Sequence, residues 1–125
     1  MNYSHSPEFK KDLKRLSKRW RSLPADIAQA EHDIAPLYDD VNKIDIEIYR
    51  NAFFSGSRAT ILLQDEHAEA VKMRLDVASL GNSQKVRVVF VAVKTENEII
   101  FVELYAKNDK DREDPSRFER YVRNI

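Results

Sequence analysis

The chain contains no cysteine and only three histidines, and these scarcities exclude several kinds of chemistry. Without cysteine it forms no disulfide, has no thiol nucleophile and builds no cysteine-based zinc site. The histidines, His5, His32 and His67, are scattered along the sequence and leave little from which to build a metal centre. We therefore expect no metal ion and no cofactor.

The chain also lacks long apolar runs and a leader-like beginning. No segment approaches the roughly 20 apolar residues that a membrane-spanning helix requires. Residues 1–7 do not show a basic stretch followed by an apolar one, the pattern that is typical of a secretion signal. These absences predict a cytoplasmic protein that makes no contact with a membrane.

The chain also has no net charge, because 21 basic residues balance 21 acidic ones. The charge is nevertheless spread unevenly. Residues 1–24 carry seven basic side chains against two acidic ones, residues 25–71 three against ten, and residues 72–125 eleven against nine. Overall charge therefore does not attract the chain to nucleic acid, and any such contact depends on a local basic patch.

The first part of the sequence predicts two helices joined by a short link. Ser6-Pro7 is typical of a helix start. An apolar stripe at helical spacing follows over about four turns, formed by Phe9, Leu13, Leu16, Trp20 and Leu23. Pro24 opens a second helix whose stripe ends at Val41, and Pro36 requires a kink or a restart within it. The short link predicts a helical hairpin.

Strand patterns dominate the rest of the sequence. Alternation of Ile44, Ile46 and Ile48 with polar residues predicts a short strand. Further strands are predicted at residues 61–63, 71–77, 86–93 and 99–106, with turns at residues 55–57 and 94–98. Residues 71–77 also fit a helix, but their strict alternation favours a strand. Residues 86–93 are apolar on both faces except for Arg87, which is typical of a central strand.

A short C-terminal helix opens at Asp114-Pro115, with Phe118, Tyr121 and Val122 on its apolar side. Together the elements predict a single α+β domain over residues 1–125. In it, the N-terminal helical hairpin packs on one face of a small, mainly antiparallel sheet, and the short helix ends the chain. The hydrophobic content of 42% is sufficient for the core of such a domain.

Basic side chains are set into the apolar strands, and Arg87 is the most informative of them. A guanidinium inside an apolar strand is costly to desolvate unless it has a partner. Arg87 therefore either pairs with an acid, such as Glu98 or Glu103, or lies on an open sheet face where it meets an anion.

Strand alternation places five basic or phenolic side chains on one sheet face. The apolar residues of strand 71–77 must face the helices, so Lys72 and Arg74 face away from them. The following hairpin sets Arg87 opposite Tyr105 on that same face. We therefore expect one cluster there, formed by Lys72, Arg74, Arg87, Tyr105 and Lys107.

The register of this hairpin depends on its loop. A three-residue loop, residues 95–97, pairs Lys94 with Glu98. Glu103 then shares the face of the cluster and is available to pair with one of its cations.

Each member of the cluster also has a simpler interpretation. On periodicity alone, Lys72 and Arg74 are ordinary solvated residues of a sheet face. Tyr105 is a packed strand aromatic, and residues 107–114, which mix charges of both signs, form a solvated loop.

Several cations beside a phenol are suited to phosphate, because they hold a phosphodiester and neutralise the charge that builds up at phosphorus. With no acid pair or histidine pair in the sequence pattern, we interpret the cluster as a site for metal-independent RNA cleavage. The ribose 2′-hydroxyl attacks the adjacent phosphate, and Lys72 helps to remove its proton. Arg74 and Arg87 hold the phosphoryl oxygens. Tyr105 or Lys107 assists the leaving oxygen.

Four stretches together resemble the RelE/ParE toxin superfamily, and within it the RelE- and HigB-like ribonucleases. They are the opening Ser6–Leu16, the basic strand Val71–Leu75, the arginine strand Val86–Phe90 and the stretch Leu104–Lys110. The resemblance implies the toxin of a bacterial type II toxin–antitoxin pair, held inactive by a cognate antitoxin protein. Ribonucleases of this family usually cleave mRNA on the ribosome and need no metal.

The resemblance also assigns residues by position. Lys72, Arg74 and Arg87 match the functional basic residues of the family, and Lys107 lies near the last of them. Two alternatives stay open. A ParE-like toxin inhibits DNA gyrase by binding and needs no catalytic cluster, and a degenerate member is a catalytically inactive binding module.

Overall fold

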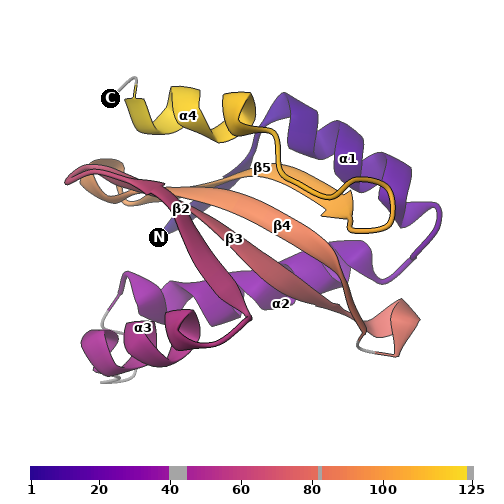
Figure 1. Cartoon of the computed structure of the whole chain (residues 1–125), viewed down its shortest axis with the longest axis horizontal. Helices are drawn as coiled ribbons and strands as arrows, with labels where there is room; N and C mark the ends of the chain where they lie inside the picture. The colour runs from indigo at the N-terminus through magenta and orange to yellow at the C-terminus, as the bar shows by residue number, and fades with distance from the viewer. Residues whose placement is uncertain (40–44, 82, 124–125) are drawn as a thin grey trace.

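The computed structural model is an α+β fold built on one five-stranded sheet (Figure 1). The structure describes residues 1–39, 45–81 and 83–123. The sheet order is β1-β5-β4-β3-β2; β1 runs parallel to β5 and the other neighbours are antiparallel, which confirms a mainly antiparallel sheet. The strands are β1 (Asn2–His5), β2 (Ala59–Gln64), β3 (Ala68–Val77), β4 (Ser83–Val93) and β5 (Glu98–Ala106). The α-helices of the described part are α1 (Pro7–Ser17), α2 (Leu23–Ile34), α3 (Ile46–Ser55) and α4 (Pro115–Arg123).

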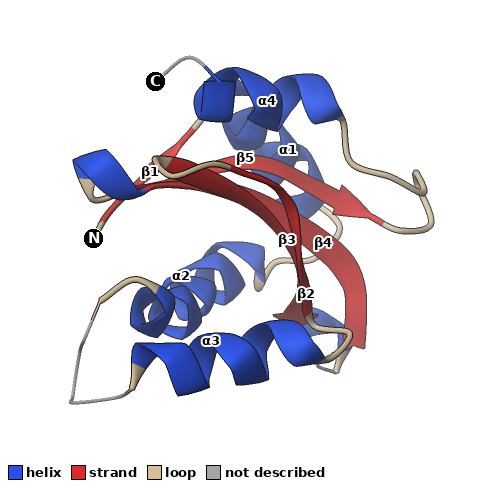
Figure 2. Cartoon of the chain, turned by 60° about the vertical axis from the view of Figure 1, so that its left-hand side comes forward, coloured by secondary structure: helices blue, strands red, loops and turns tan. Residues whose placement is uncertain are grey.

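Helices lie on both sides of the sheet (Figures 1 and 2). α2 and α3 cover one face, and the larger core lies there, with Phe9, Ile27, Phe53, Phe90 and Phe101 among its members. α4 lies over the other face, where a smaller core contains Ala68, Val91, Val93, Phe118 and Val122. α4 therefore packs toward the end of the sheet that carries Ala68 and Val93. The other end of that face stays uncovered by helix and carries the pocket described below.

The predicted N-terminal helical hairpin is wrong, because a strand comes first. β1 extends the sheet beyond β5, and α1 then runs along β5 at the sheet edge. There Asp12 accepts the backbone N–H of Leu104 at 3.0 Å and also pairs with Arg117 of α4 at 2.6 Å. α1 is therefore fixed at the sheet edge beside α4, while Phe9 and Leu16 on its inner side belong to the same larger core as α2.

The helices also end earlier than the apolar stripes predict. α1 stops at Ser17. α2 stops at Ile34, and a 3-10 helix, η1 (Ala35–Leu37), continues the chain, so the kink or restart predicted at Pro36 takes the form of a change of helix type at Ala35. Val41, the last residue of the predicted stripe, lies outside the described residues.

The predicted short strand at residues 44–48 is also wrong, because Ile46 and Ile48 belong to α3. Asp45 caps this helix: its carboxylate accepts the Ile48 N–H at 3.2 Å. Ile48 is 68% exposed, so Ile46 and Ile48 do not share a buried face. Ile44 lies outside the described residues. The strand predicted at residues 61–63 is confirmed as part of β2.

The three long strands confirm the predicted meander, with β4 between β3 and β5. The turn differs, since Val93, and not Lys94, pairs with Glu98. The register then shifts between Val89 and Phe90, where β5 contributes one extra residue. The two differences cancel, and Arg87 lies opposite Tyr105 as predicted.

Candidate functional site

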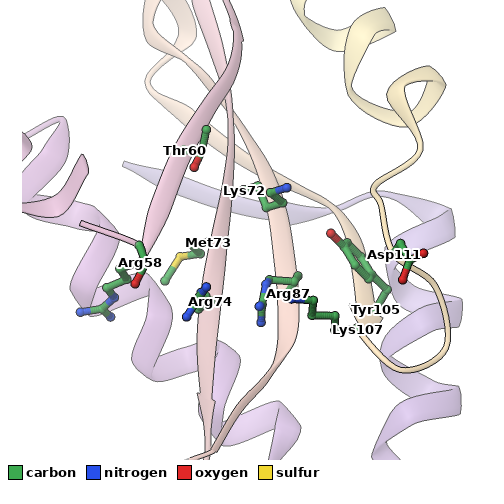
Figure 3. A pocket seen from close by; sticks show the side chains of 10 residues that line it. Arg58, Thr60, Lys72, Met73, Arg74, Arg87, Tyr105, Lys107 and Asp111 are labelled. Carbon is green, nitrogen blue, oxygen red and sulfur yellow. The ribbon is translucent and has the colours of Figure 1, made fainter. Parts of the chain in front are cut away.

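A pocket of about 330 Å³ opens on the same sheet face as α4, in the part that α4 does not cover (Figure 3). It contains all five side chains that the sequence places in one cluster. Five further residues complete its wall. The lining residues are Ser57, Arg58, Thr60, Lys72, Met73, Arg74, Arg87, Tyr105, Lys107 and Asp111.

Strand pairing arranges the cluster in three levels along the sheet. Arg74, Arg87 and Tyr105 form the middle level, because each lies opposite the next across β3, β4 and β5. Lys72 lies one level away on one side, opposite Val89. Lys107 lies one level away on the other side, where its N–H donates to the Lys85 carbonyl at 2.9 Å. Adjacent levels are two residues apart along a strand, or about 7 Å.

Arg87 is almost fully buried, at 8% exposure, and its guanidinium donates to the Gln84 carbonyl. Within the described residues it pairs with no carboxylate. The two predicted acid partners bind elsewhere: Glu98 accepts the Ser4 hydroxyl at 2.8 Å, and Glu103 pairs with Lys110. Burial and then the neighbouring Arg74 lower the pKa of Arg87. An arginine nevertheless stays protonated, so the middle level presents positive charge to the pocket.

A carboxylate that the sequence pattern did not indicate borders the pocket beside two of its lining residues, Lys72 and Tyr105. The Glu113 Oε2 atom accepts from Lys72 Nζ at 3.1 Å and from the Tyr105 hydroxyl at 3.4 Å. Burial alone raises the pKa of Glu113, but hydrogen bonds from its own backbone N–H and from Lys72 lower it overall. Glu113 is therefore an ionised carboxylate at neutral pH.

Tyr105 is held by the segment between β5 and α4. Lys110 Nζ lies 5.2 Å from the centroid of its ring, and its hydroxyl donates to Glu113. Burial, followed by the charges of Glu113 and Glu103, raises the pKa of Tyr105 to about 12. Tyr105 is therefore a phenol, and a proton donor, in the neutral pH range.

Replacing Tyr105 with phenylalanine is expected to reduce the amount of unfolding free energy that the protein loses at alkaline pH. The pKa of Tyr105 is about 12 in the folded protein and about 10 in an unfolded chain. The unfolded chain therefore ionises first, and the folded state loses stability as the pH rises from about 10 to about 12. Urea unfolding across this pH range measures the decline. It should be smaller in Tyr105→Phe, though not absent, because the pKa of Tyr3 is raised in the same direction. An unchanged decline contradicts this environment for Tyr105.

Three charged residues in or beside the pocket were missed by sequence reasoning: Arg58, Asp111 and Glu113. Arg58 precedes β2 and pairs with Asp33 of α2 at 2.7 Å, an interaction between distant segments that no local pattern indicates. Glu113 belongs to the segment that its mixed charges predict to be a solvated loop. Residues 107–112 are indeed exposed, but the Glu113 side chain is only 13% exposed. Its position directly before the helix start at Asp114-Pro115 was the available signal.

A second polar cluster lies on the opposite side of the sheet around Glu69, which is fully buried. Its carboxylate accepts from Tyr38 at 2.8 Å, from Arg50 at 3.0 Å and from Lys94 at 3.1 Å. These bonds satisfy the carboxylate and join α3 and the β4–β5 turn to β3, so we interpret this cluster as structural.

In the part of the chain that the structure describes, no three histidine, aspartate or glutamate side chains are grouped to hold a metal ion. No helix of that part is both long and apolar enough to cross a membrane. No family model, curated protein or solved structure matches the chain. The pocket and the sequence pattern are therefore the basis for assigning a function.

Proposed function

We propose that this chain is a metal-independent endoribonuclease that cleaves mRNA, acting in the cytoplasm as the toxin of a bacterial type II toxin–antitoxin module. The observation that supports this most is the convergence of Lys72, Arg74, Arg87, Tyr105 and Lys107 in one pocket. The order of the sequence stretches that resemble the RelE/ParE superfamily also supports it. The proposal implies mRNA, associated with the ribosome, as the substrate and an antitoxin protein as the inhibitor.

In this proposal the scissile phosphate binds at the middle level. Arg74 and Arg87 lie opposite each other there, and neither pairs with a carboxylate within the described residues. Both guanidinium groups are then available for the phosphoryl oxygens, where they stabilise the charge that develops in the transition state. The 2′-hydroxyl attacks phosphorus and the bond to the 5′-oxygen breaks, which gives a 2′,3′-cyclic phosphate and a 5′-hydroxyl.

The chemistry is tested with purified protein and a single-stranded RNA, in the presence of a metal chelator, with and without translating ribosomes. We expect fragments that end in a 2′,3′-cyclic phosphate and a 5′-hydroxyl. DNA of the same sequence is the matched control and should remain intact, because it lacks the attacking hydroxyl. Cleavage of the DNA, or cleavage of RNA only when a divalent metal is added, contradicts the mechanism.

The biological part is tested by inducing expression in a bacterium while following growth and mapping mRNA 5′ ends by primer extension. Growth arrest with new mRNA ends supports the ribonuclease. Arrest with intact mRNA and induced DNA-damage signalling supports a ParE-like gyrase inhibitor. Normal growth supports an inactive binding module.

A further inference from the structure

We propose that Glu113 is a catalytic residue of this ribonuclease, the base that accepts the proton of the attacking 2′-hydroxyl. This inference rests on the proposed function and adds a residue to it. Glu113 follows the last strand and lies outside the basic cluster that the sequence predicts. Its carboxylate nevertheless contacts two members of that cluster, Lys72 and Tyr105.

The backbone beside Glu113 is fixed, so its carboxylate has a defined position. The N–H of Asp114 donates to Glu103 Oε1 at 2.8 Å, and Glu103 is fully buried in β5. Asp114 then accepts the N–H and the hydroxyl of Ser116 at the start of α4. Lys110 binds the second oxygen of Glu103. The segment that carries Glu113 is thus attached to the sheet on one side and to α4 on the other, as a reacting group requires.

Glu113 is also the proton acceptor among the three polar groups that it forms with Lys72 and Tyr105 at the border of the pocket. Lys72 donates to Glu113 as an ammonium, and an ammonium has no lone pair to accept another proton. Tyr105 donates its hydroxyl proton to the same oxygen and remains a phenol. The role of base given to Lys72 on sequence alone therefore passes to Glu113, and Lys72 orients the carboxylate.

The order of the residues along the pocket also fits an in-line reaction. The attacking and leaving oxygens lie on opposite sides of phosphorus. With phosphate at Arg74 and Arg87, Lys72 lies toward one end of the pocket and Lys107 toward the other (Figure 3). Glu113 lies at the Lys72 end, because its carboxylate is 3.1 Å from Lys72 Nζ. Tyr105 is only 3.4 Å from Glu113, so the two cannot serve opposite sides of the same phosphorus. Lys107 is then the donor for the leaving oxygen.

The proton balance of the step follows. The 2′-hydroxyl proton passes to the Glu113 carboxylate as the bond from the 2′-oxygen to phosphorus forms. The bond from phosphorus to the 5′-oxygen breaks, and Lys107 gives a proton to that oxygen. The next cycle begins after Glu113 returns its proton to water and Lys107 takes one up.

The experiment compares Glu113→Gln with Glu119→Gln, a matched change at an exposed residue of α4 that is not hydrogen-bonded to Lys72 or Tyr105. Single-turnover cleavage and equilibrium binding of the same RNA are measured, with ribosomes if the wild type needs them, and thermal unfolding checks the fold. We expect Glu113→Gln to cleave about 10²–10⁴-fold more slowly, with binding changed only a few-fold. Glu119→Gln should behave like the wild type.

A second substrate distinguishes the two sides of phosphorus. An RNA with sulfur in place of the scissile 5′-oxygen releases a thiolate, which leaves without being protonated. On this RNA, Lys107→Met should recover most of its lost rate, whereas Glu113→Gln should stay slow. Because base and donor act on different bonds, this pattern separates the base from the donor. Nearly unchanged RNA binding and unchanged thermal unfolding separate a base from a residue that only supports the fold.

Several results overturn the assignment. If wild type and Glu113→Gln cleave equally, Glu113 is not the base and the proposed function stands. If Glu113→Gln binds and cleaves RNA better than the wild type, the carboxylate merely blocks the phosphate site. If the sulfur-containing RNA rescues Glu113→Gln, Glu113 acts on the leaving side. If the wild type cleaves no RNA, the proposed function and this inference both fail.

Discussion

Replacing Arg87 with alanine is expected to lower the rate of RNA cleavage by about 10²–10³-fold, the usual loss when one preorganised donor to a developing negative charge is removed. Arg87 lies in the middle of the three levels and faces both Arg74 and Tyr105 across the sheet. Within the described part of the chain, its guanidinium donates to the Gln84 carbonyl and to no carboxylate. The fold should therefore survive, because the change also relieves repulsion between two neighbouring cations.

Single-turnover assays of wild type, Arg87→Ala and Arg87→Lys, with urea unfolding of each, measure this effect. The lysine variant keeps the charge but loses the paired donors of the guanidinium, so its rate should be intermediate. Arg112→Ala is the matched control, because Arg112 is exposed and does not line the pocket. A fully active Arg87→Ala protein removes the observation on which the proposed function rests, and growth arrest by that variant in cells favours gyrase inhibition.

Replacing Phe101 with alanine is expected to cost about 3–5 kcal/mol of unfolding free energy. Phe101 is fully buried in β5 at the meeting point of the sheet, β1 and α1. Its ring centroid lies 5.5 Å from that of Phe9, 5.6 Å from His5, and 6.3 Å from both Tyr3 and Phe90. Truncating the side chain leaves a cavity and removes ring contacts to β1, α1 and β4 at the same time. Since domains are stable by only about 5–15 kcal/mol, this loss is a large fraction of the total.

Urea unfolding followed by circular dichroism measures this loss as a lower midpoint at an unchanged slope. Ile48→Ala is the control, because it removes an aliphatic side chain that is 68% exposed and should change stability by less than about 0.5 kcal/mol. If the two variants unfold at the same urea concentration, the packing around Phe101 is not as described.

The parts of the fold that the sequence predicted well are those in which pattern and burial agree. Residues 71–77 of β3 alternate between buried and more exposed positions. Residues 86–93 of β4 are buried on both faces and lie inside the sheet. β1 was missed because its four residues carry no such pattern; parallel pairing with β5, almost a hundred residues away, makes it a strand. At residues 46–48, the cap from Asp45 outweighed the alternation.

The residues of the candidate site also divide into those that the sequence could predict and those that it could not. Five side chains could be grouped from strand parity, because parity fixes the face on which each residue lies. Arg87 and Tyr105 came out opposite each other although the turn was misjudged, since the register shift in β5 compensates for it. Glu113 could not be placed, because the path of the segment that carries it depends on Glu103 holding the N–H of Asp114.

The parallel pairing of β1 with β5 has a consequence for the time at which the molecule is completed during translation. Asn2 pairs with Glu98 and His5 with Phe101, so β1 leaves the ribosome well before β5 and must wait for it before it joins the sheet. The pocket needs Tyr105 from that same late strand, and Glu113 is made later still. A nascent chain that has not yet produced these residues has neither a complete sheet edge nor a complete pocket, and the two are finished at nearly the same moment of synthesis.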